Sequence, residues 1–253
     1  MRLPHRLDHG QEVELVGHLE ELRSRIFVAG GAILVTTILA FTIHRRVITL
    51  LVSQLPPNHR HLLTLGIAEP FTTSLKVSLA LGFALALPIV LWQLWSFLAP
   101  ALDPKVQQGI AGFTVFAAVL MCGGIIFGYE VALPAALHFL TNYDNSVYDV
   151  QVRAADFISF AVLVLAACGA VFELPIVVLG LVRVRALTSK KLRGNRKIGY
   201  MIVACIGVAL PGVDPVTTVM ETIPLAILFE TSIWLSAIFE KRWFAPLRTA
   251  EEI

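Results

Sequence analysis

The stretch VGHLEELRSRIF, residues 16–27, places two acids and two arginines directly before the first long apolar run. Glu21 and Arg25 are four residues apart in the order that stabilises a helix, a pair worth about 0.2–0.5 kcal/mol on a solvated face. A carboxylate can instead accept a guanidinium through two parallel hydrogen bonds, which distinguishes arginine from lysine. The residues alone leave both interpretations open: a helix-stabilising pair, or an exposed acceptor at a membrane surface for an incoming cation.

Three further acids, Glu173, Glu221 and Glu230, interrupt apolar runs. A charge at membrane depth costs about 2.5–3.5 kcal/mol even on the lenient insertion scale, so Glu173 must face a partner, water or a cavity. Pro175 removes a helical hydrogen bond nearby and bends the helix there. We expect Glu173 to form a polar spot on a concave wall, with hydrogen bonding between helices as the alternative. Glu221 is expected near the outer interface and solvated.

Glu230 lies two and a half turns after Glu221, so the two acids point to roughly opposite faces of one helix. We expect Glu230 to make a contact with another helix or another subunit.

The sequence contains no motif typical of a metal site or of a catalytic site. The three cysteines all fall in apolar runs without C-x-x-C spacing, and the seven histidines show no paired-ligand spacing. A G-x-S-x-G motif and paired carboxylates within the apolar runs are also missing, which argues against a membrane protease. We predict no cofactor, no metal and no enzymatic activity.

The elements that must position these residues are membrane helices. The chain of 253 residues is 57% hydrophobic and 15% charged, with a mean hydropathy of +0.77, and a crossing needs about 20 apolar residues. The sequence predicts an all-α protein with six transmembrane helices. Its apolar runs cover 26–44, 77–102, 106–129, 157–172 continued through FELPIVVLGLV, 198–213 and about 219–239.

Fifteen of the 20 lysines and arginines fall in alternate connecting segments and the two ends of the chain, and four fall in the other segments. The positive-inside rule therefore places both termini in the cytoplasm. The predicted domains are an N-terminal segment with an amphipathic helix (1–25), a membrane domain (26–239) and a cytoplasmic tail (240–253). Pro88, Pro175 and Pro224 bend helices, so we expect a curved, concave bundle.

Several motifs resemble one family in order and spacing. GHLEELRSRIF is followed by AEPFTTSLKVSL, LPIVLWQLWSFLAPAL, FELP and PGVDP. Together they resemble TatC, the multispanning receptor subunit of the twin-arginine protein translocase, from about residue 12 to residue 240.

The resemblance implies a receptor for export of folded proteins, driven by the membrane proton gradient, in a bacterial-type plasma or inner membrane. It implies TatA and TatB type single-span subunits, twin-arginine signal peptides and lipid as partners, in a hetero-oligomer with possible self-association and without nucleic acid. By matching positions, the implied signal-peptide site contains Glu21, Arg23, Phe97 and Pro100. Glu173 matches the family's glutamate in a membrane-embedded concavity.

The chain departs from the family where a second arginine-binding acid is usual, because Val106 occupies that position. Glu20 and Asp103 are the candidates to replace it, although Asp103 before Pro104 also fits a helix N-cap. Asp214 matches the family's last aspartate in an outer (periplasmic) turn, while Thr218 stands where glutamine is usual. Asp214 fits a simple loop turn equally well.

Two alternatives to a working receptor remain. One is a proton-coupled solute transporter that uses Glu173 and Glu230 as a relay, against which the missing inverted repeat argues. The other is a divergent TatC paralogue with altered signal recognition.

Overall fold

The computed structural model describes residues 9–98, 110–144, 146–148, 150–183, 186–209 and 215–243. Apart from an isolated bridge between Leu63 and Arg153, the regular structure of these residues is helical. The elements are α1 (His9–Ser53), η1 (Pro57–His59), α2 (Glu69–Leu98), α4 (Ile110–Phe127), the π-helical turn η3 (Gly128–Ala132), α5 (Leu133–Asn142), α6 (Ala154–Phe172), α7 (Leu174–Arg183), α8 (Ser189–Gly194), α9 (Arg196–Ala209) and α10 (Pro215–Trp243).

Five segments of the described chain are long and apolar enough to cross a membrane: Leu19–Ser53, Glu69–Leu94, Gly112–Asn142, Ala154–Arg183 and Thr218–Glu240. The fifth predicted run corresponds to α9, which has 14 residues. At 1.5 Å per residue this helix is about 21 Å long, less than the roughly 30 Å of the hydrocarbon layer. The structure therefore supports an all-helical membrane protein with five long crossings and one short helix.

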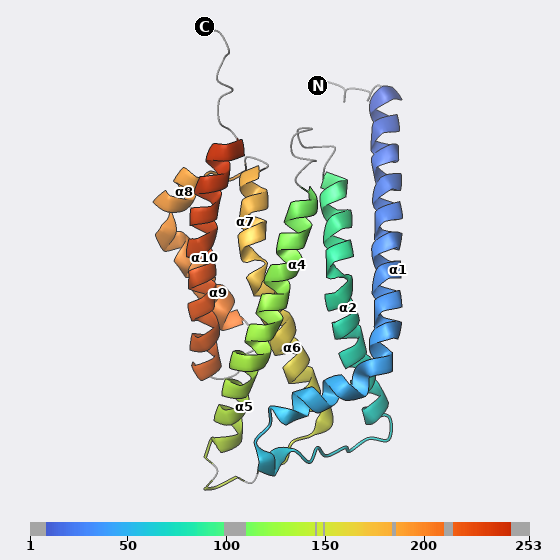
Figure 1. The fold of residues 1–253 in the computed structure, drawn as a ribbon, viewed down its shortest axis with the longest axis vertical. Helices are drawn as coiled ribbons and strands as arrows, with labels where there is room; N and C mark the ends of the chain where they lie inside the picture. Colours follow the sequence, from blue (N-terminus) through green and yellow to red (C-terminus); the bar gives the residue numbers. More distant parts are fainter. Residues whose placement is uncertain are drawn as a thin grey trace, which may run out of the picture.

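The N-terminal amphipathic segment and the first span form one helix, because α1 continues through the predicted boundary between residues 25 and 26. Its 45 residues give a length of about 68 Å. Figure 1 shows that α1 runs along α2 and that its last part turns across the lower end of the bundle. The turn lets a helix twice the thickness of the hydrocarbon layer remain with the other helices.

Glycine allows the closest helix contact in this region. A Cβ atom on Gly82 of α2 would lie 2.5 Å from the Thr37 Cα atom of α1. The Thr36 hydroxyl donates a 2.7 Å hydrogen bond to the Gly82 carbonyl at the same contact. The two backbones approach this closely only because Gly82 has no side chain.

The predicted bend at Pro175 is present as a helix break. Glu173 is a single turn residue between α6 and α7, and Figure 1 shows the two helices at different angles. Proline has no N–H to donate, so the regular ladder stops one turn before it.

Two apolar clusters hold the bundle together. The larger joins the end of α1 to α2, α5 and α6 through residues such as Leu55, Leu133 and Ile158. The smaller joins α9 to α10 around Val203 and Phe229. Figure 1 shows α8, the start of α1 and the end of α10 at the upper end of the bundle, and the ends of α5 and η1 at the lower end.

Candidate functional site

The two adjacent acids of α1 point to different neighbours. The Arg25 guanidinium donates to Glu21 Oε1 from Nε at 3.0 Å and from Nη2 at 2.5 Å. Arg25 also reaches the Gln93 side chain of α2 at 3.5 Å. Glu21 is therefore already engaged with a guanidinium from its own helix, on the side of α1 that meets α2.

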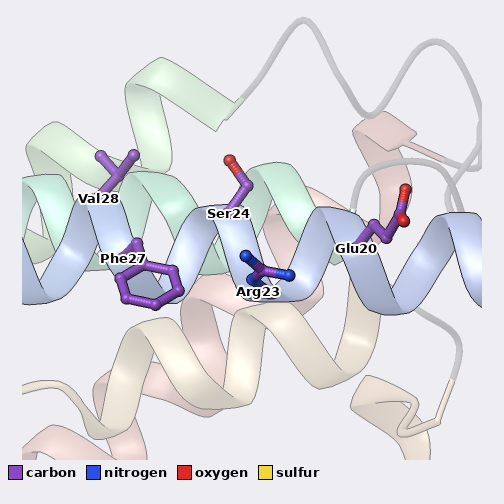
Figure 2. A pocket seen from close by; sticks show the side chains of 5 residues that line it. All are labelled: Glu20, Arg23, Ser24, Phe27 and Val28. Atoms are coloured by element: carbon purple, nitrogen blue, oxygen red, sulfur yellow. The ribbon is translucent and has the colours of Figure 1, made fainter.

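Glu20 lies instead at an open hollow of about 560 Å³ on another side of α1, lined by Glu20, Arg23, Ser24, Phe27 and Val28. Figure 2 shows Arg23 and Phe27 beside each other on α1, with Glu20 about one turn away. The Arg23 guanidinium carbon lies 5.9 Å from the centre of the Phe27 ring, within the range of a cation–π contact. The hollow thus combines an exposed acid with an aromatic ring that can receive a cation.

The other predicted signal-site residues are only partly described. Phe97 is half-buried in the last turn of α2, one turn after Gln93 and on the same face. Pro100, Asp103 and Val106 lie outside the described residues, as does Asp214. Their placement in a site therefore stays a prediction.

Glu173 has an unusual environment for a carboxylate. Both of its oxygens are buried, and no hydrogen-bond partner for them occurs among the described residues. The helix break at this position leaves the residue between the ends of α6 and α7. Removing a carboxylate from water without a partner is costly, which makes Glu173 a candidate functional residue.

The expectation that Glu221 is solvated is wrong. Its relative exposure is 2%, and together with Phe127 of α4 and Cys168 of α6 it lines a cavity of only about 10 Å³. The neighbouring helices cover this face of α10, which a hydropathy profile of the single helix does not reveal. Glu221 is therefore a buried acid where α4, α6 and α10 meet.

Glu230 makes a contact between helices within the chain. Its carboxylate accepts a hydrogen bond from Arg196 at 3.1 Å and one from the Tyr200 hydroxyl at 2.7 Å, both from α9. Arg196 is the first residue of α9, close to α8, and its guanidinium balances the charge of the Glu230 carboxylate.

An ion pair that the sequence analysis did not predict, between Glu69 and Arg153, connects α2 with the segment before α6. The Glu69 carboxylate, 6% exposed, accepts hydrogen bonds from the backbone N–H groups of Leu65, Gly66 and Ala155 at 3.0–3.2 Å. Arg153 donates to the same carboxylate at 3.2 Å from Nε, and this bond raises the pKa of the Arg153 guanidinium. The cluster joins the loop before α2 to the start of α6.

Comparison with known proteins identifies the family. Residues 17–224 match the family described as Sec-independent protein translocase protein (TatC). The chain belongs to the TatC family.

Two TatC proteins are similar to this chain along nearly their whole length. The Carboxydothermus hydrogenoformans protein named Sec-independent protein translocase protein TatC is 32% identical over 235 residues, covering 92% of this chain and 97% of its own. TatCd of Bacillus subtilis is 32% identical over 233 residues, which cover 92% of this chain and 95% of TatCd. A crystal structure titled Twin Arginine Translocase Receptor TatC superposes with a TM-score of 0.74 at 32% identity, covering 87% of this chain and 98% of that one.

The TatC match includes both acids of α1, the Glu69–Arg153 cluster, Glu173 and Glu221, whereas Glu230 lies beyond its end. The TatC fold thus accounts for the arrangement of helices that brings Glu69 and Arg153 together across 84 residues.

Proposed function

We propose that this chain is the receptor and core subunit of a twin-arginine translocase, binding Arg-Arg signal peptides at its cytoplasmic face and organising proton-gradient-driven export of folded proteins. Membership of the TatC family, a family of translocase components rather than of enzymes, supports the translocase role. The observation that carries the receptor role is the pair of adjacent carboxylates near the start of α1, one exposed and one engaged with a guanidinium.

The geometry supports an exchange of guanidiniums. The Glu21 carboxylate already accepts Arg25 through two donors of the guanidinium, so the same acceptor can bind a signal arginine when Arg25 turns away. Glu20, exposed at the hollow beside Arg23 and Phe27, can accept the second arginine. Phe97 and Pro100 complete the proposed site on the basis of the family resemblance, and Asp103 is a further candidate for the acid that Val106 replaces.

The same proposal places six crossings in a bacterial-type inner membrane, with both termini in the cytoplasm and a concave membrane face. The start of α1, α8 and the end of α10 lie at one end of the bundle (Figure 1), as an even number of crossings requires. TatA and TatB type single-span subunits are the proposed partners. The Glu173 carboxylate, which has no hydrogen-bond partner among the described residues, is the proposed polar spot within the concave face.

A binding measurement tests the receptor role. The full chain in lipid nanodiscs is titrated with a fluorescent twin-arginine signal peptide, and the anisotropy is followed. We expect Glu21→Gln to weaken binding at least tenfold, because a neutral amide no longer forms a charge-assisted pair, and we expect a Lys-Lys peptide to bind as weakly to the unaltered chain. Asp156→Asn, an exposed acid of α6, is the matched control. If wild type, Glu20→Gln and Glu21→Gln bind the signal peptide with equal affinity, these two acids do not form the signal-peptide site.

Complementation separates a working receptor from a divergent paralogue. The chain is expressed in a bacterium lacking TatC, and export of a twin-arginine substrate is scored. Export by the unaltered chain is the expected result; export only after Val106→Glu indicates a paralogue that has lost the second acid. Solute uptake by proteoliposomes of the purified chain, with no export, would instead support the transporter.

A further inference from the structure

α7, α8, α9 and α10 enclose a groove of about 410 Å³. Figure 1 shows α8, which lines one side of it, at the upper end of the bundle. The walls of the groove are apolar side chains, including Leu181 of α7 and Ile198 and Ile202 of α9, while Lys191 and Asn195 add polar groups. The groove lies on a different part of the chain from the acids of α1, so it does not depend on the proposed receptor site.

The floor of the groove is tightly packed. The Phe229 ring of α10 lies against Gly199 of α9 so closely that a Cβ atom on the glycine would be 2.0 Å from the ring. Phe229 belongs to a buried cluster with Val203 and Ile233. The groove is therefore bounded by packed helices.

Positive charge is concentrated beside the groove. Residues 188–197 contain five cations and no acid. Two of them are engaged: Arg196 pairs with Glu230 at 3.1 Å, and the Arg193 guanidinium carbon lies 5.8 Å from the centre of a Trp234 ring. Lys190, Lys191 and Lys197 are exposed.

Within the part of the chain that the structure describes, these three lysines have no acidic partner. The carboxylate of the nearby Glu240 accepts a 2.7 Å hydrogen bond from the backbone N–H of Ser189. An anion at the groove would therefore meet ammonium groups whose charge is not already balanced.

We infer that this groove binds one anionic phospholipid, with an acyl chain along the apolar walls and the phosphate at Lys191, assisted by the adjacent Lys190. Basic pockets between transmembrane helices are suited to acidic lipid headgroups, and lysine stems can lie along apolar surface with the ammonium outside. A membrane helix of a partner subunit is about 10 Å wide, so 410 Å³ holds only about one turn of it. A hydrocarbon chain is much thinner and fits the groove along its length.

The test measures lipid binding to the full purified chain in a mild non-ionic detergent by native mass spectrometry. Phosphatidylglycerol and phosphatidylcholine with the same acyl chains are titrated separately. We expect phosphatidylglycerol to bind at least tenfold more tightly. The double substitution Lys190→Gln and Lys191→Gln should remove this preference and leave phosphatidylcholine binding unchanged. Arg45→Gln with Arg46→Gln removes the same charge from exposed positions of α1 and should change neither lipid.

A second pair of variants tests the acyl chain. Ile202→Trp fills the groove and should weaken phosphatidylglycerol binding, whereas Met201→Trp, on an exposed neighbouring position outside the lining, should not. Inorganic phosphate should fail to displace the lipid.

The inference is overturned if both lipids bind equally, or if the lysine and arginine double variants behave alike. Displacement by phosphate with no effect of Ile202→Trp would indicate a simple anion site. Crosslinking of a single-span subunit to a cysteine at position 202 would assign the groove to a protein partner.

Discussion

At the scale of single residues, the buried acids differ in how their charge is satisfied. Glu69 accepts three backbone N–H groups and a guanidinium. Glu173 has no hydrogen-bond partner among the described residues. A fully satisfied carboxylate supports the fold, whereas an unsatisfied one has a cost that points to function.

Replacement of Glu69 should therefore destabilise the protein. Glu69→Ala leaves three backbone donors and the Arg153 guanidinium without an acceptor, so the melting temperature should fall clearly. Arg153→Gln should cost less, because that side chain is 42% exposed and the backbone donors keep their acceptor. Thermal unfolding in detergent, followed by tryptophan fluorescence, measures both. The control Asp156→Asn removes an exposed acid nearby; an equal fall in its melting temperature would contradict the assignment.

Arg25 should act as a competitor for the signal peptide. Glu21 and Arg25 are partly buried, and an i,i+4 ion pair on a helix contributes only about 0.3–0.5 kcal/mol, so Arg25→Gln should change the melting temperature little. The same change removes the competing Arg25 guanidinium from the Glu21 carboxylate, so the affinity for a twin-arginine peptide should rise severalfold. Peptide titration of Arg25→Gln against Arg45→Gln checks this; a weaker affinity for the first variant would mean that Arg25 itself helps to bind the signal.

At the scale of elements, glycines set the distance between helices at particular points. Gly82 lets α1 and α2 touch through their backbones, and a Cβ atom on Gly124 of α4 would lie 2.6 Å from the Cys168 carbonyl of α6. A Cβ atom on Gly30 or Gly112 would meet nothing within 4 Å. Identical residues in apolar helices therefore have different roles, which depend on the neighbouring helix.

Gly82→Ala should lower the melting temperature, because the added methyl group would lie 2.5 Å from the Thr37 backbone and the Thr36 hydrogen bond would lengthen. Gly30→Ala is the matched control: it introduces the same group into open space and should be neutral or stabilising, since alanine favours helix. Thermal unfolding of both variants distinguishes them. Equal stability of the two would mean that the helices separate without cost.

The sequence predicts features that depend on one turn of helix, and it does not predict contacts between distant helices. The sequence predicts a bend near Pro175 because proline acts on its own turn of helix, and the structure has a helix break there, at Glu173. The burial of Glu221 was missed because it depends on α4 and α6 packing over α10. The Glu69–Arg153 contact was also missed, since nothing in either segment indicates a partner 84 residues away.

At the scale of the whole molecule, the number of crossings depends on α9. Without α9 as a crossing, the five long segments would place the two ends of the chain on opposite sides of the membrane. With it, the start of α1, α8 and the end of α10 share one side, which agrees with their position at one end of the bundle in Figure 1. The excess of lysine and arginine over residues 188–197 predicts that this side is the cytoplasm.

Single cysteines introduced into a cysteine-free variant and labelled in intact cells with a membrane-impermeant maleimide test this topology. Ser146→Cys, between α5 and α6, should react in intact cells. Lys190→Cys and a cysteine appended after Ile253 should react only after the membrane is permeabilised, because both lie on the cytoplasmic side of a six-span chain. Reaction of the appended cysteine in intact cells, with Lys190→Cys still protected, would mean that α9 does not cross and that the chain has five spans. The reverse pattern at all three positions would invert the proposed orientation and place the acids of α1 on the side where no signal peptide arrives.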